Sequence, residues 1–235
     1  MRRLKTYSSN HLDYMTNVIT FSFMPISLYK KIDEVTALGV WDVTEAETWF
    51  LQRLDLVSEE EEALDKIKAT AKRREWLGAR WLLHYLGSGE SRQPCLKDTF
   101  GKPYLQGSST EISISHSNGK AAVLRSRQPA GIDIQKRVEK IYRIKHKFVN
   151  AKEEKWLRPD HILSDLHLIW GAKEALYKIY SKKKVDFCKE LEIKRPDFES
   201  QKAIGKIYKN KDQTYDIHYQ WMGDFILVYT VAQKH

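Results

Sequence analysis

Alternation of apolar and polar residues marks three short strands in the middle of the chain. Residues 112–115 read Ile-Ser-Ile-Ser, the period of a strand with one buried face. A polar turn follows at 116–119, a second strand is expected at 121–124, and a third at 132–134 after a Pro-Ala-Gly turn. We expect these strands to organise the molecule, because chemically suggestive residues stand at their ends.

Helical periodicity is strongest in two longer segments, one on each side of these strands. The first begins near Ser58, where we expect an N-cap followed by glutamates in the first helical turn, and continues through 66–86 with a broad apolar face. The second covers 163–180 and has a wide apolar side. Shorter helices are predicted at 139–148 and from a capped start at Asn150.

Strand-like patterns fill both ends of the chain. Residues 17–29 are rich in β-branched and aromatic residues, with Pro25 indicating an edge or a bend, whereas 39–51 is ambiguous. Three segments near the C-terminus predict an antiparallel meander: 203–208, 214–221 and 225–231. Each half of the chain is therefore expected to combine strands with one long helix, without an internal sequence repeat.

Composition narrows the class of protein and of partner. The chain has 235 residues, 42% hydrophobic and 30% charged, as is typical of a globular protein with a core. A formal charge of +9 indicates an acidic partner, a phosphorylated ligand or nucleic acid. Cys95 and Cys188 are isolated, which argues against a zinc site or a disulfide framework. Without a membrane-length apolar run or a signal-peptide pattern, the expected location is the cytoplasm.

Five short motifs occur in order between Phe100 and Lys178: GKPYL, ISISHS, GIDIQ, FVNAKEE and WGAKEALYK. In order and spacing this series resembles the 4′-phosphopantetheinyl transferase superfamily, and within it the long, monomeric, surfactin-synthetase-activating class. The resemblance implies an α/β (α+β) fold, a pseudo-dimer of two similar halves. Each half would be a small, mainly antiparallel sheet packed against a long helix, with the active site in the cleft between the halves. We expect an N-terminal, coenzyme A-binding half at 1–126 and a C-terminal, metal-binding and catalytic half at 127–235.

Asp133 and Glu174 are candidate ligands for a divalent cation. Mg²⁺ prefers carboxylate oxygens and completes its shell with water and substrate phosphates. Taken alone, an aspartate between two isoleucines is equally consistent with a solvent-facing side chain. The resemblance implies that both carboxylates bind Mg²⁺, with Mn²⁺ as an alternative. Gln135 stands where many relatives carry a third acidic ligand; its carbonyl oxygen can coordinate, directly or through water, but brings no charge.

Glu174 and Lys178 lie on one face of the predicted helix, at i and i+4. Without the resemblance, an ordinary surface ion pair is expected. The resemblance implies that Glu174 is also the general base for an acceptor serine, and that Lys178 stabilises charge on the phosphate or the leaving group. Lys173 should point elsewhere on the helix, where it could touch a partner, and Trp170 is expected to pack the two halves together.

Coenzyme A carries a 3′-phosphate and a pyrophosphate, which bind to cationic and hydroxyl-bearing side chains. The resemblance assigns three residues to this coenzyme: Lys102, Ser115 and His116. Arg74 sits where relatives have a basic residue facing the adenosine phosphate, and Arg80 on the same helix is the competing choice. Lys66 is a further candidate for the 3′-phosphate.

The resemblance implies an enzyme of fatty-acid or secondary-metabolite biosynthesis. It would transfer 4′-phosphopantetheine from coenzyme A to a serine hydroxyl of an apo carrier protein, with Mg²⁺, giving holo carrier protein and adenosine 3′,5′-bisphosphate. The partner would be an acidic acyl or peptidyl carrier protein, and the protein a monomer. The basic run 182–184 is either a solvated helix end or a landing patch for that carrier.

Two other classes of function are open from the sequence. A non-catalytic relative that binds coenzyme A or a carrier protein is favoured by Gln135 and disfavoured by the retained carboxylates and cations. A nucleic-acid binder agrees with the net charge, but the basic residues are interleaved with acids and no nucleic-acid motif is present.

Overall fold

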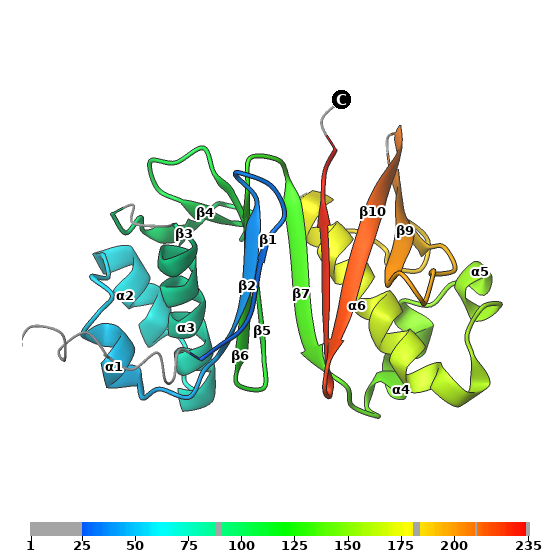
Figure 1. The fold of residues 1–235 in the computed structure, drawn as a ribbon, viewed down its shortest axis with the longest axis horizontal. Helices are drawn as coiled ribbons and strands as arrows, with labels where there is room; N and C mark the ends of the chain where they lie inside the picture. The colour runs from blue at the N-terminus through cyan, green and yellow to red at the C-terminus, as the bar shows by residue number, and fades with distance from the viewer. Residues whose placement is uncertain (1–24, 88–90, 181–183, 210, 234–235) are drawn as a thin grey trace, which may run out of the picture.

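Two antiparallel sheets stand side by side in the middle of the molecule, and helices cover the outer side of each (Figure 1). The structure, a computed structural model, describes residues 25–87, 91–180, 184–209 and 211–233. The layers run helices, sheet, sheet, helices, which confirms a mixed α/β fold with antiparallel sheets. Of the strand predicted at 17–29, residues 17–24 lie outside the described residues, as do the basic residues 182 and 183, whereas 26–29 are in a strand.

The first sheet has the strand order β1-β2-β6-β5. Its strands are β1 (Ile26–Lys31), β2 (Ala37–Asp42), β5 (Glu111–Ser117) and β6 (Lys120–Ser126). Its outer helices are α1 (Glu47–Leu51), α2 (Ser58–Asp65) and the long α3 (Thr70–Leu86). A separate ribbon pairs β3 (Cys95–Lys97) with β4 (Pro103–Leu105).

The second sheet has the strand order β7-β11-β10-β9-β8. Its strands are β7 (Ala130–Lys136), β8 (Leu191–Ile193), β9 (Lys202–Lys209), β10 (Lys211–Met222) and β11 (Phe225–Val231). The long α6 (Ile162–Tyr180) lies against it, with the short α4 (Ile141–Ile144) and α5 (Ala151–Glu154) nearby (Figure 1). Two 3₁₀ turns complete this half: η1 (Lys145–Lys147) and η2 (Pro159–His161).

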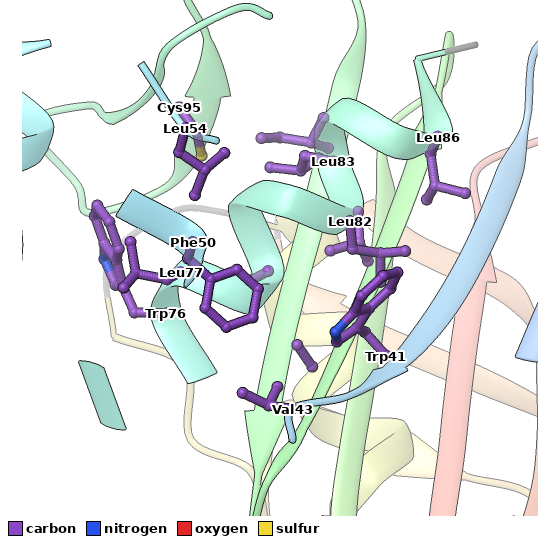
Figure 2. Close-up of a cluster of buried hydrophobic side chains, with 14 of the residues drawn as sticks. Trp41, Val43, Phe50, Leu54, Trp76, Leu77, Leu82, Leu83, Leu86 and Cys95 are labelled. Atoms are coloured by element: carbon purple, nitrogen blue, oxygen red, sulfur yellow. The ribbon is translucent and has the colours of Figure 1, made fainter. Parts of the chain in front are cut away.

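Strand alternation divides the apolar residues of the first sheet between two cores. Trp41 of β2 packs with the helices, in the cluster that Figure 2 shows around Phe50 and Leu77. Gly39 lets α3 approach the sheet, because a Cβ at this position would lie 3.1 Å from Leu82 Cδ1. The outer face of the sheet is thereby closed by α1 and α3.

The opposite face of β2 and β6 forms a shared core with the second sheet. Leu38 and Leu124 from the first sheet pack there with Ile132 and Leu227 from the second, and all four are buried. A further core lies between the second sheet and α6. The two sheets are therefore joined face to face by aliphatic side chains.

The predicted central strands and the C-terminal meander are confirmed; β11 has the predicted bounds and the other strands are somewhat longer than expected. His116 and Ser117 belong to β5, so the turn that follows is confined to Asn118 and Gly119. The long helix α6 and the capped start at Asn150 are also confirmed. Asn150 and Glu153 form a complete capping box at the start of α5.

Three helix predictions are wrong in their boundaries. The helix expected through 66–86 is broken, because Arg73 Nη1 of α3 donates to the Leu64 carbonyl at 2.7 Å and closes the end of α2. The N-cap of α2 is Val57, and Ser58 is already helical. The segment predicted at 139–148 contains only one α-helical turn and a 3₁₀ turn.

The run of glutamates at the start of α2 is not uniformly solvated. Glu60 is buried, accepts a hydrogen bond from the Cys95 N–H at 3.0 Å, and forms ion pairs with Arg92 and Arg80. These contacts tie α2 to α3 and to the β3–β4 ribbon. Glu60 is therefore a structural residue whose cost of burial is offset by its partners.

Trp170 does not pack the two halves together, contrary to expectation. Its ring packs against Phe148 and Phe187, with centroids 5.1 and 5.6 Å away, within the core of the second sheet and α6. The sheet-to-sheet contact is made instead by the aliphatic core described above. No helix in the described part of the chain is long and apolar enough to cross a membrane.

Candidate functional site

Strands β5 and β7 meet where the two sheets join, and serine side chains link them. The Ile132 N–H donates to Ser113 Oγ at 3.0 Å, and Ser115 Oγ donates to Asp133 Oδ1 at 2.8 Å. Alternate residues of β5 therefore reach toward β7, as the two-residue period of a strand requires. This junction brings the predicted Ser115 and Asp133 together.

A cavity of about 630 Å³ opens beside this junction. Its lining residues come from both sheet-and-helix halves, that is, from before and after the turn that joins β6 to β7. Its basic lining residues are Arg80, Lys97, Lys102, His116, Lys178 and Lys184. Trp76, Phe100 and Tyr177 supply aromatic surface, and Glu174 is the one carboxylate among the described lining residues. The size and the charge suit a small organic ligand with several phosphate groups.

Asp133 is buried and accepts hydrogen bonds from three side chains. Its Oδ1 accepts from Ser115 and from Lys178 Nζ, the latter at 3.0 Å, and its Oδ2 accepts from Gln135 Nε2 at 3.2 Å. Lys178 Nζ also donates to the Ile132 carbonyl at 2.6 Å. Lys178 thus reaches from α6 to β7 and forms an ion pair with Asp133. It is not simply the partner of Glu174 in a surface ion pair, as its position on the helix alone suggested.

Glu174 is a carboxylate whose pKa lies close to neutral pH. Burial, followed by the charge of Asp133, raises the pKa of Glu174 to about 7, and Lys178 opposes this shift. Near neutral pH this carboxylate can therefore exchange a proton, which is the property of a general base. Asp133 is therefore near enough to affect the charge state of Glu174.

The two carboxylates fit a hard divalent cation. Mg²⁺ is commonly held by one or two protein carboxylates together with water and phosphate oxygens, and a cation between Asp133 and Glu174 would relieve their repulsion. Among the described residues there is no group of three or more His, Cys, Asp and Glu side chains placed to hold a metal. The chain would therefore leave several coordination positions to other ligands.

Gln135 is held in one orientation by a residue that the sequence analysis missed. Its Nε2 lies 3.2 Å from both Asp133 Oδ2 and the His167 carbonyl, and two acceptors on one side require the amide nitrogen there. Its Oε1 accepts from His167 Nδ1 at 2.8 Å, while the Val138 N–H donates to His167 Nε2 at 2.9 Å. Metal coordination by Gln135 Oε1 stays a prediction, and it would require this amide to turn.

His167 carried a sequence signal that could have been used. It lies on α6 seven residues before Glu174, and such spacing places two side chains on the same helix face. Burial lowers the pKa of His167, which keeps the imidazole neutral. Gly171, between them on this face, makes room for the amide, because a Cβ there would lie 2.9 Å from Gln135 Nε2.

The structure brings some of the predicted coenzyme-binding residues to the cavity and leaves others away from it. Lys102 lines the cavity and pairs with Glu111 at 2.7 Å. Arg74 and Lys66 are not among the residues that line it: Lys66 is exposed beyond the end of α2, and Arg74 Nε has no hydrogen-bond partner in the described structure. Roles for both residues stay predictions.

Arg80, the competing choice on α3, does line the cavity. It is buried, its guanidinium stacks 3.0 Å from the Trp76 ring centroid, and its Nη2 donates to the Cys95 carbonyl at 3.0 Å. Burial lowers the pKa of Arg80 to about 10, so it remains a cation at neutral pH. It contributes positive charge to the cavity from a fixed position.

Lys173 cannot touch a partner, contrary to one expectation. It is completely buried, and its Nζ donates to Glu153 Oε2 at 2.7 Å. The same nitrogen donates to the carbonyls of Phe148 and Phe187, at 2.6 and 2.8 Å. Lys173 therefore holds together three segments that surround α6, next to Glu174 in sequence but on another face of the helix.

A second, more open groove meets the cavity at Glu174, Tyr177 and Lys184. Its other lining residues include the aromatic Trp170 and Phe187. Of the predicted basic patch 182–184, only Lys184 is described, and it lines both the cavity and the groove. Glu174 can therefore be approached from two directions.

Comparison with known proteins finds one family similarity, in the C-terminal part of the chain. Residues 129–230 match the family model of the 4′-phosphopantetheinyl transferase superfamily, which confirms the resemblance at that level. The matched segment contains Asp133, Gln135, Glu174 and Lys178. This stretch, which is less than half of the 235 residues, is therefore similar to the 4′-phosphopantetheinyl transferase superfamily. No curated protein matches the chain.

Proposed function

We propose that this protein transfers the 4′-phosphopantetheine group of coenzyme A to a serine hydroxyl of an apo carrier protein. The observation that carries the proposal is Glu174, a carboxylate with a pKa of about 7 beside Asp133, at the point where a cation-lined cavity meets an open groove. The similarity of residues 129–230 to the 4′-phosphopantetheinyl transferase superfamily supports phosphopantetheinyl transfer, and the two openings support two different substrates.

Coenzyme A would occupy the cavity. Its phosphate groups would lie among cations from both sheet-and-helix halves, with Lys102 and His116 on one side and Lys178 on the other. Ser115 currently donates to Asp133, so its predicted contact with a coenzyme phosphate would require rotation of the hydroxyl group. Arg80 adds charge that Arg74 and Lys66 were expected to supply.

The acceptor serine would reach Glu174 from the groove. The attacking oxygen would form a bond to the phosphorus on the pantetheine side of the pyrophosphate, and the bond to the adenosine 5′-phosphate would break. Glu174 would take the serine proton, and Lys178 would stabilise the charge that develops on the phosphate oxygens. Mg²⁺ held by Asp133 and Glu174 would neutralise pyrophosphate charge and favour departure of adenosine 3′,5′-bisphosphate.

The finer predictions about assembly and partner belong to the same proposal. The halves 1–126 and 127–235 would form a pseudo-dimer within one monomeric chain, since each combines an antiparallel sheet with one long helix, α3 or α6. The acceptor would be an acidic acyl or peptidyl carrier protein. The groove is lined by Lys147, Lys184 and Lys189 together with Asp186 and Glu190, so it offers that partner charges of both signs.

The intact mass of an apo carrier protein, incubated with this protein, coenzyme A and Mg²⁺, tests the proposal. We expect a gain of one phosphopantetheine group. Replacing Glu174→Gln should slow the transfer by about 10²–10⁴-fold, the usual contribution of a general base. The matched control is Glu154→Gln, which removes an exposed carboxylate of α5 and should leave the rate unchanged.

A result without mass gain would point to the alternative function. If several carrier classes stay unmodified while coenzyme A binds tightly, the protein is a non-catalytic binder of the coenzyme. The observation that favours this alternative is the Gln135 amide, whose nitrogen faces Asp133. If Gln135 is the cause, Gln135→Glu should then restore transfer.

A further inference from the structure

Glu75 is a buried carboxylate to which the proposed reaction assigns no role, yet it contacts a residue of the cavity. It lies on α3 and is only 2% exposed. Its Oε2 accepts from His116 Nδ1 at 2.9 Å and from Lys72 Nζ at 2.7 Å, and its Oε1 accepts from the Gly119 N–H at 2.8 Å. A single carboxylate thus joins α3, strand β5 and the β5–β6 turn.

The β5–β6 turn is built to make this contact. Asn118 and Gly119 have φ angles of 48° and 80°, the left-handed pair that a two-residue hairpin turn requires. Their conformation directs the Gly119 N–H at Glu75. Burial opposes ionisation of Glu75, but the donors Gly119, Lys72 and His116 together hold its pKa below the usual value. Glu75 is therefore an anion at neutral pH.

An anionic Glu75 fixes the tautomer of His116. A carboxylate only accepts hydrogen bonds, so the proton of a neutral His116 must be on Nδ1. Its Nε2 then carries a lone pair and is the ring nitrogen left for the cavity that His116 lines. A lone pair cannot donate to a phosphate oxygen, so neutral His116 is the wrong partner for such a ligand.

Burial, assisted by two nearby lysines, keeps His116 neutral while the cavity holds no anion. Burial lowers the pKa of His116, Glu75 opposes this effect, and Lys72 from α3 and Lys178 from α6 add to it. A phosphate in the cavity would reverse this balance, because an imidazolium would then lie between two anions. Protonation and phosphate binding would favour each other.

We propose that His116 takes up a proton from solvent when a phosphate group of the ligand enters the cavity, and that Glu75 is the positioning residue that makes this possible. The inference rests on the proposed function, because it takes coenzyme A as the ligand. Glu75 holds Nδ1–H, presents Nε2 to the cavity and compensates the positive charge once it forms. Binding of the coenzyme should therefore weaken as the pH rises.

Calorimetric titration with coenzyme A at pH 7.5, in two phosphate-free buffers of different ionisation enthalpy, measures the protons taken up on binding. All proteins compared carry Glu174→Gln, because Glu174 lines the same cavity with a pKa of about 7 and would add its own proton exchange. In this background, with Mg²⁺ at a fixed concentration, we expect net uptake that approaches ~1 proton per coenzyme bound. Glu75→Gln keeps the shape of the side chain but removes its charge. It should reduce the uptake and weaken binding about tenfold, the effect of ~1 unit of lost pKa compensation.

Two further variants separate this role from general damage to the helix. His116→Gln should abolish the uptake. The matched control is Glu47→Gln, which neutralises a carboxylate paired with Arg73 of α3 and should change neither the affinity nor the proton number. As a measurement on the wild-type protein, the NMR shift of the His116 ring Hε1 should report a neutral ring alone and a charged ring with coenzyme A.

Each outcome separates this inference from the proposed function. If coenzyme A does not bind the wild-type protein, the proposed function fails. If it binds without proton uptake in the Glu174→Gln background, or with equal uptake when Glu75→Gln is added, the coupling is refuted while the proposed function stands. If Glu75→Gln does not fold, a His116 ring that stays neutral in the complex refutes the coupling instead.

Discussion

At the scale of single residues, Glu174 is held in a state that costs stability. Its ordinary pKa near 4.5 rises to about 7 in the fold because burial and Asp133 disfavour the carboxylate. A group whose pKa is raised on folding contributes stability below its unfolded pKa, and that contribution is lost as the pH rises through the folded value. The residue proposed as the base therefore destabilises the metal-free protein at alkaline pH.

Replacing Glu174→Gln should make the metal-free protein more stable at pH 8. We expect the free energy of unfolding to rise by ~1–2 kcal/mol, a figure reduced for the partial exposure of the side chain. At pH 5 the gain should be much smaller, and it should vanish only below the unfolded pKa near 4.5, where Glu174 is protonated in both states. Urea denaturation in the presence of EDTA at both pH values measures the effect. An equal gain at both values would show that the charge is not its cause.

At the scale of elements, α6 performs separate tasks on separate faces. One face presents His167, Gly171 and Glu174 to β7, where the amide of Gln135 fits over the glycine. Another face buries Lys173 against α5 and the loop that contains Phe187. A buried lysine that satisfies three acceptors from other segments is stable only while all of them stay in place.

The variant Lys173→Met tests how much this arrangement contributes to stability. Removing the ammonium group leaves Glu153 buried without its ionic partner, so the protein should lose ~3–5 kcal/mol. Chemical denaturation monitored by tryptophan fluorescence measures the loss. The exposed Lys189→Met is the control, and it should change stability by less than ~0.5 kcal/mol. A loss of similar size in both variants would contradict a special role for Lys173.

Elements with a strong period were predictable from the sequence, whereas contacts between distant segments were not. The alternation around Ile112 and the long apolar face of α6 each set a period that folding preserves. The break between α2 and α3 depends on Arg73, which caps a carbonyl of another helix. Periodicity cannot register such a contact, since the apolar pattern continues through the break.

In the candidate site, too, residues in short sequence motifs were predictable, whereas residues brought in by the fold were not. Lys102, Ser115 and His116 were found because they stand in short motifs, and the structure places them on the cavity. Arg80 replaced Arg74 as a lining residue, because the rotation of α3 about its axis is set by tertiary packing. Glu75 was missed, because only the fold brings it to His116.

At the scale of the whole molecule, the aliphatic core between the sheets makes the halves depend on each other. Leu38 and Leu124 from one sheet, and Ile132 and Leu227 from the other, would all be exposed if the halves separated. Burial of such side chains contributes roughly 1.5–3 kcal/mol each. The halves should therefore not be independently stable.

We accordingly expect one cooperative unfolding transition for the full chain. Differential scanning calorimetry should give a calorimetric enthalpy equal to the van't Hoff enthalpy, as for a two-state protein. Two resolved transitions would contradict this expectation and would indicate independently folding halves. The substitution Leu227→Ala, in the shared core, should lower the midpoint of that one transition without splitting it.

The meeting of the cavity and the groove at Glu174 has a consequence for the order of events. A donor and an acceptor that enter through separate openings do not have to wait for one another, and either product can leave by the way its parent arrived. The transferred group then does not have to be held covalently on the protein while one substrate leaves and the other enters through the same opening. For the proposed reaction, this arrangement favours direct transfer within a ternary complex, in which the Glu174 carboxylate would contact both reactants at once.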